Sequence, residues 1–121
     1  MLKEIIVVGL GGALGAILRY GSSLLGAAAG LSSQLTTMIV NIVGSCAIGY
    51  FLGLCKPGSL LLFLTVGVCG SFTTFSTFSS QSVLMIQGGR YWTAASYILA
   101  SVVLCMIFTF IGYKLAEYGA K

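Results

Sequence analysis

The sequence contains no histidine and no aspartate, and its only carboxylate side chains, Glu4 and Glu117, lie near the two ends of the chain. Buried carboxylates and histidines are what proton-coupled antiport and cation binding inside a membrane normally use. The remaining residues offer no nucleophile with a base beside it, no metal-ligand cluster and no phosphate-binding loop. The sequence therefore argues against a proton-coupled transporter and against an enzyme, and we expect no nucleic-acid partner.

Charge of either sign is also scarce. Charged residues make up 7% of the 121 residues and hydrophobic residues 58%, and the mean hydropathy is +1.07. A soluble domain of this composition lacks the polar residues to cover its core. The charge-free runs 20–55, 57–89 and 91–113 are long enough to contain membrane helices, which need about 20 residues each. We predict an all-α integral membrane protein.

Turn-forming residues divide these runs into four predicted transmembrane helices of a single domain, 1–121. The dividing segments are Gly26–Gln34, Lys56–Gly58, which holds the only proline, and Gln87–Arg90. The predicted helices cover about 5–25, 35–54, 59–86 and 91–113.

The third predicted helix is longer than one straight crossing needs. Its middle, Gly67–Thr74, is rich in residues that weaken helices, so we expect a break near its centre. Irregular backbone within a membrane is tolerated only where protein buries it or where it lines a polar cavity. The expected break therefore marks a functional centre.

The basic residues give only a weak orientation signal. With four spans, Arg90 and, if it reaches out, Arg19 lie on one side, and the other side receives Lys3, Lys56, Lys114 and Lys121. Insertion in both orientations with antiparallel pairing, and a single orientation with those lysines in the cytoplasm, both remain open.

Four helices are too few to enclose a pore and also shield a broken helix from lipid, which argues for an oligomer. The pairs Gly11/Gly15 and Gly49/Gly53 provide small-residue faces for close helix packing. The four cysteines lie in apolar runs without a C-x-x-C spacing, so we expect small buried residues that neither bind metal nor form disulfides.

Two polar residues in the first two spans each allow two interpretations. Arg19, near the end of the first span, either reaches to the membrane surface or supplies a charge that attracts anions to a vestibule or holds a dimer together. Asn41 either binds a neighbouring backbone carbonyl or donates to a dehydrating anion, with Ser45 on the same helix face.

The densest polar cluster follows the expected break, in Gly70–Ser80. Phe75 and Phe78 are spaced i,i+3, so their rings either pack together or flank a path for an anion, which is attracted to the electropositive ring edge. In the fourth span a stripe at i,i+4 intervals either hydrogen-bonds a neighbouring helix or supplies donors to such a path: Tyr97, Ser101, Cys105 and Thr109.

Three segments, Gly11–Tyr20, Asn41–Ser45 and Gly70–Phe78, resemble in order and spacing the signature stretches of the Fluc (CrcB) fluoride channels. The resemblance extends over essentially the whole chain. It implies passive export of cytoplasmic fluoride by an antiparallel, dual-topology homodimer, surrounded by lipid in the bacterial cytoplasmic membrane, with two pathways that each use both subunits. Pairing with a paralogue remains open.

The resemblance also assigns residues. A structural sodium ion would lie at the dimer interface, held by the backbone carbonyls of Gly70 and Thr73. Arg19 matches the family's arginine near the end of the first helix. The fluoride pathway would involve Asn41 as a donor, Phe75 and Phe78 as ring-edge contacts, Thr74, Ser76 and Thr77 as a polar track, and Tyr97, Ser101 and Cys105 on the fourth helix.

Two other functions remain alternatives. A small multidrug-type dual-topology transporter also has four spans, but it normally needs a carboxylate in the first helix, where this chain offers only Glu4. A membrane assembly subunit without transport activity would tolerate apolar residues at Asn41, Phe75 and Phe78.

Overall fold

The computed structural model describes residues 1–121 as helices joined by short connections, with no strand. Four helical stretches are long and apolar enough to cross a membrane: Leu2–Ala28, Ser33–Leu54, Ser59–Gln87 and Tyr91–Gly119. Each predicted span falls within one of these stretches. The prediction of an all-α fold with four membrane-capable helices is confirmed.

The third stretch is broken, as predicted. It consists of α3 (Ser59–Leu62), the π-helical segment η1 (Phe63–Cys69), α4 (Gly70–Phe72) and α5 (Phe75–Gln87). The break itself is confined to Thr73 and Thr74, which have extended backbone. The preceding glycines remain helical, although π turns of this kind are rare and often mark functional sites.

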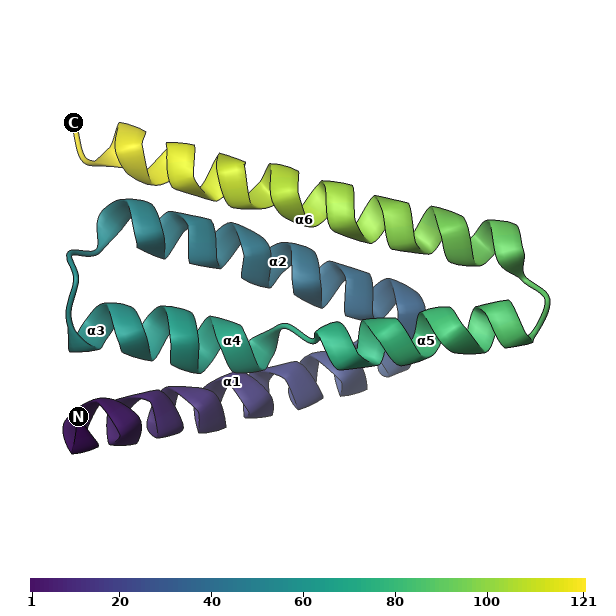
Figure 1. Ribbon diagram of the computed structural model, residues 1–121, viewed down its shortest axis with the longest axis horizontal. Coiled ribbons are helices and arrows are strands. Elements are labelled where there is room, and N and C mark those ends of the chain that lie inside the picture. The colour runs from purple at the N-terminus through teal and green to yellow at the C-terminus, as the bar shows by residue number, and fades with distance from the viewer.

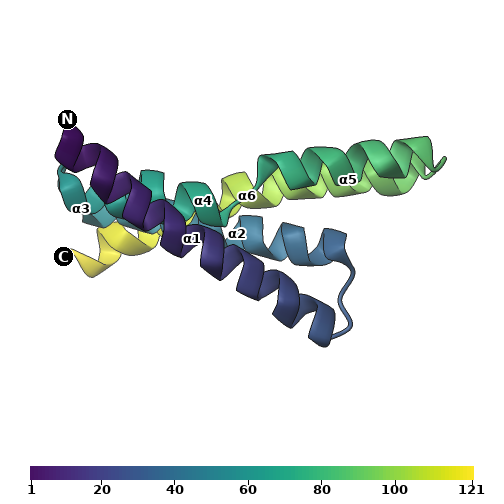
Figure 2. The same ribbon diagram turned by 90° about the horizontal axis from the view of Figure 1, so that it is seen from below.

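The helices form two packed pairs. α1 (Leu2–Ala28) lies against η1 and α4, and α2 (Ser33–Leu54) lies along α6 (Tyr91–Gly119). Figure 1 shows both termini and the connection between α2 and α3 at one end of the bundle. Figure 2 shows that α5 and the part of α6 beside it extend away from α1 at the opposite end. The four lysines named above therefore share one end, as the predicted spans require.

Glycines allow the close approach within each pair. A Cβ atom added to Gly15 would collide with the carbonyl oxygen of Val68, and one added to Gly49 would collide with that of Thr109. The small-residue faces that we considered for oligomer packing are thus used inside the chain. They bring backbone against backbone, which is how membrane helices gain packing contacts without a hydrophobic driving force.

Local signals set the ends of the helices. The Ser32 hydroxyl caps α2 by accepting from the Leu35 N–H at 3.2 Å, and Gly30 and Gly89 take left-handed φ values of 74° and 76° in the two connections. The first connection is shorter than predicted because α1 continues through Ala28. α6 continues to Gly119, beyond the predicted end of the apolar span.

Candidate functional site

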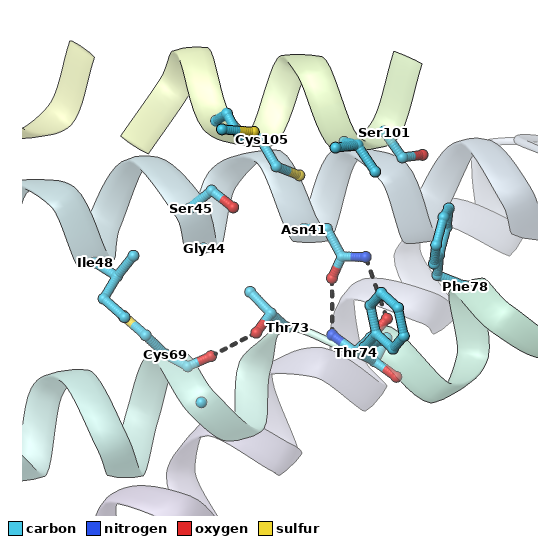
Figure 3. A pocket seen from close by; sticks show the side chains of 14 residues that line it. Asn41, Gly44, Ser45, Ile48, Cys69, Thr73, Thr74, Phe78, Ser101 and Cys105 are labelled. Atoms are coloured by element: carbon cyan, nitrogen blue, oxygen red, sulfur yellow. Dashed lines mark hydrogen bonds between the residues drawn. The ribbon is translucent and has the colours of Figure 1, made fainter. Parts of the chain in front are cut away.

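Asn41 joins α2 to the break in the third helix. Its Oδ1 accepts from the Thr74 N–H at 2.7 Å, and its Nδ2 donates to the Thr74 carbonyl at 3.2 Å (Figure 3). The side-chain amide therefore replaces the backbone partner that Thr74 lost when the helix broke. One of the two expected roles, binding a backbone carbonyl, is observed, and the second N–H of Nδ2 remains for another acceptor.

Two backbone N–H groups at the break donate to side chains. Two carbonyls are therefore left without the donors that they would have in a continuous helix. The Thr74 N–H, which would bond the Gly70 carbonyl in a continuous helix, donates to Asn41. The Thr77 N–H, which would bond the Thr73 carbonyl, donates to the Thr74 hydroxyl at 3.2 Å. Gly70 is exposed, and a Cβ atom added there would meet only the Thr65 carbonyl oxygen, at 3.5 Å. These oxygens are free to coordinate a cation.

Thr74 caps the N-terminus of α5 on the other side of the break. Besides accepting from the Thr77 N–H, its Oγ1 donates to Thr77 Oγ1 at 3.0 Å and lies 3.4 Å from Ser76 Oγ. The first amides of a helix carry the positive end of its dipole. The break therefore presents a carbonyl end that favours cations and an amide end that favours anions.

A cavity of about 340 Å³ lies at the break between α2, the third helix and α6. Eight of the predicted site residues line its wall: Asn41, Gly70, Thr73, Thr74, Phe75, Phe78, Ser101 and Cys105. Figure 3 shows the helix break on one side of this cavity and the α6 residues Ser101 and Cys105 on the other. Residues far apart in the sequence are thus brought together at one polar break inside an apolar bundle.

The two phenylalanines form a tilted aromatic pair at the start of α5. Their ring centroids are 5.4 Å apart at an interplanar angle of 49°, and the Phe78 ring also lies 5.3 Å from the Tyr97 ring. Phe78 is buried, whereas Phe75 is 77% exposed. The predicted i,i+3 pairing is observed, and Phe75 presents a ring on the open side of the cavity.

Ser101 contributes a hydroxyl with no partner. Its Oγ is the one buried side-chain nitrogen or oxygen that makes no hydrogen bond, although Ser101 is only 4% exposed. A buried hydroxyl normally finds a partner, since leaving it unpaired costs about 1–3 kcal/mol. Ser101 is on the cavity wall, so a rotation of its side chain would offer this unused donor to a ligand.

Arg19 lies apart from this group, beside a second cavity of about 180 Å³ between α1, α2 and α5. Thr74 and Thr77 line this cavity as well, so Thr74 faces both. Neither salt bridge of the chain involves Arg19. Its guanidinium is therefore not neutralised by a carboxylate.

Sequence reasoning missed a hydrogen-bonded chain centred on Gln81. The Tyr97 hydroxyl donates to Gln81 Oε1 at 2.7 Å, and Gln81 Nε2 donates to Thr37 Oγ1 at 3.1 Å and to Ser33 Oγ at 3.3 Å. A glutamine one turn after Phe78 in an apolar helix was the available signal.

Two predicted pathway residues, Ser76 and Tyr97, are on the wall of neither cavity, although each contacts a residue that is.

Comparison with known proteins gives a family for the whole chain. The family described as "CrcB-like protein, Camphor Resistance (CrcB)" matches residues 6–113. Three relatives carry the name fluoride-specific ion channel FluC. That of Elusimicrobium minutum is 38% identical over 97% of this chain and 96% of its own. Those of a Thermus thermophilus strain and of Campylobacter jejuni are each 40% identical, over 94% and 93% of this chain and 95% and 97% of their own. With four membrane-capable helices and such relatives, this is a multi-pass bacterial membrane protein, and it belongs to the CrcB-like family.

Proposed function

We propose that this chain forms a fluoride-selective passive channel that exports fluoride from the cytoplasm. Its family membership and the names of its relatives support this function. The structural observation that carries it is the cavity at the helix break, whose wall contains an aromatic pair and a serine with an unpaired hydroxyl.

Fluoride is small and strongly hydrated, so a selective pathway must replace its water with many closely placed donors. The cavity wall offers the remaining N–H of Asn41, the Ser101 hydroxyl and the ring edges of Phe75 and Phe78. The N-terminus of α5 adds the positive end of the helix dipole, which attracts an anion without a charged side chain. Chloride is excluded by its size and by the poorer donor geometry that a larger ion meets.

Arg19 would attract anions to the second cavity, which is the vestibule in this proposal. From there Thr74 leads to the first cavity, because this residue lies on the wall of both. Thr77 and Ser76 lie within hydrogen-bonding distance of Thr74 and would form the polar track with it. Tyr97 would act through Phe78, whose ring it contacts.

A second subunit would complete the pathway. In a lipid environment polar backbone must be covered by protein, and here Gly70 and the ring of Phe75 are exposed at the level of the break. An antiparallel homodimer in a dual-topology arrangement would cover both copies of this surface. A paralogue with the same surface would serve equally.

The same surface fits a structural sodium ion at the dimer interface. Sodium is a hard cation that prefers oxygen ligands, and no group of three or more acidic, cysteine or histidine side chains is present to bind a metal. The carbonyls of Gly70 and Thr73 have lost their helical donors, so two copies of the chain would present four free oxygens at one place. Broken helices in transporters coordinate sodium with unwound carbonyls in this way.

Fluoride would then leave the cell down its electrochemical gradient, and the chain needs no energy source for this. The alternative of a small multidrug-type transporter would rest on Glu4. That carboxylate lies in the first turn of α1, is 58% exposed and lies 3.7 Å from the N-terminal ammonium group. Glu4 is far along α1 from Ala16 and Arg19, the nearest residues of that helix on the wall of the second cavity.

Fluoride efflux from proteoliposomes that contain only the purified chain tests the proposal. We expect rapid fluoride loss without chloride loss, and a Phe75→Ile, Phe78→Ile variant should abolish it. Phe110→Ile is the matched control, since its ring is exposed on α6 outside both cavities. Absence of fluoride loss from the unmodified chain, or equal loss of chloride, would overturn the proposal of a self-sufficient fluoride channel.

A further inference from the structure

Three sulfur-containing side chains line the cavity at the helix break. Cys105 and Met106 are on α6, and Cys69 is at the end of η1. Figure 3 places Cys69 and Cys105 on opposite sides of this cavity. All four cysteines are free, but Cys46 and Cys55 are not part of this wall.

Fluoride conduction makes poor use of the sulfur atoms of these residues, although the family resemblance places Cys105 on the pathway. A thiol is a weak hydrogen-bond donor and a thioether donates none, so a hard anion gains little from either. Thiolate and thioether sulfur are instead the preferred ligands of soft cations such as monovalent copper, silver and divalent mercury. The unpaired hydroxyl of Ser101, one turn before Cys105, is a second sign that the wall has ligand capacity that the protein itself leaves unused.

We propose that this cavity is a binding site for a soft metal ion, with Cys105 as the anchoring ligand and Met106 as a supporting one. Cys105 is partly exposed to the cavity, whereas Cys69 is only 3% exposed and is enclosed by its neighbours. An incoming ion therefore meets Cys105 first. If the chain conducts fluoride as proposed above, the bound ion obstructs the pathway at mid-membrane depth, because Cys105 and the aromatic pair line the same cavity.

Mercury(II) chloride is a suitable probe because it is small, neutral and linear. The Cys105 sulfur forms a bond to mercury, one mercury–chlorine bond breaks, chloride leaves, and the thiol proton passes to water. No electron is transferred. Excess 2-mercaptoethanol reverses the step by taking the mercury in exchange for a proton.

The experiment combines fluoride efflux with the location of bound mercury. In proteoliposomes of the full chain, mercury(II) chloride should reduce fluoride efflux to the rate of protein-free vesicles, and 2-mercaptoethanol should restore it. Cys105→Ser should remove this sensitivity, measured against the untreated rate of the same variant. Cys46→Ser is the control, since Cys46 lies outside this cavity, and it should stay as sensitive as the parent.

Peptide mapping provides a readout that does not depend on transport. Trypsin cleaves after Arg90 and after Lys114, which releases a peptide in which Cys105 is the only cysteine. Mercury found on this peptide therefore identifies the site. Mercury at Cys105 in a chain that conducts no fluoride would support the site and reject the proposed function. Undiminished sensitivity of Cys105→Ser, or mercury found only on other peptides, would overturn the site.

Discussion

Asn41→Leu tests whether the amide bridge holds the helix break. The substitution keeps a side chain of similar size but removes both bonds to Thr74, at 2.7 and 3.2 Å. Side-chain hydrogen bonds between membrane helices average about 0.6 kcal/mol, which gives about 1 kcal/mol for the pair as a lower limit. Stranding a buried backbone group costs about 1–3 kcal/mol, which raises the upper limit to about 4 kcal/mol. We expect a loss of unfolding free energy within this range.

The assay is reversible unfolding in mixed micelles, followed by fluoride efflux from the same preparations. At the lower limit of about 1 kcal/mol the folding equilibrium constant falls about fivefold, because each 1.4 kcal/mol is a factor of ten. Ser45→Ala is the matched control, since Ser45 lines the same cavity one turn along α2 but does not bridge to Thr74. If Asn41→Leu loses no more stability than Ser45→Ala, the bridge does not hold the break. If Asn41→Leu loses fluoride efflux but keeps its full stability, Asn41 acts on the ion and does not hold the break.

Two further substitutions test the packing and the polar chain. Gly49→Ala should destabilise the fold by about 1–3 kcal/mol, because the new methyl group collides with the Thr109 carbonyl; Gly21→Ala, with open space around it, should change stability little by comparison. Gln81→Leu should slow fluoride efflux by freeing the Tyr97 ring that packs on the pathway. The Gln81→Leu, Tyr97→Phe double variant should be no slower than Gln81→Leu, whereas additive effects would show that the two residues act independently.

Much of the fold was predictable because membrane helices follow from composition and length. The spans, the broken third helix and the i,i+3 aromatic pair depend on local sequence, and the structure contains all of them. The position of the break within Gly67–Thr74 was not predictable to the residue. It depends on Asn41, 33 positions from Thr74, and on the close packing of α1 that keeps Gly67 helical.

The site was predictable as a set of residues rather than as an arrangement. Sequence spacing indicated that Tyr97 and Ser101 share a face of the fourth helix, but their surroundings differ. Tyr97 has a partner in Gln81, and Ser101 has none. That difference arises from tertiary contacts between α5 and α6, which no local pattern encodes. The division of the polar residues between two cavities, with Thr74 facing both, has the same origin.

In the proposed channel, the break at Thr73 and Thr74 lets one neutral side chain prepare sites for ions of both signs. Asn41 accepts the Thr74 N–H, so the Gly70 carbonyl loses its helical donor. The Thr74 hydroxyl accepts the Thr77 N–H, so the Thr73 carbonyl loses its donor as well. The same rearrangement starts α5 afresh, with its positive dipole end at the cavity. Oxygens for a cation and amides for an anion thus arise from a single interruption of the helix, with no buried formal charge to stabilise. This accounts for a chain that has no carboxylate in the middle of any span and yet carries a polar centre at mid-membrane depth.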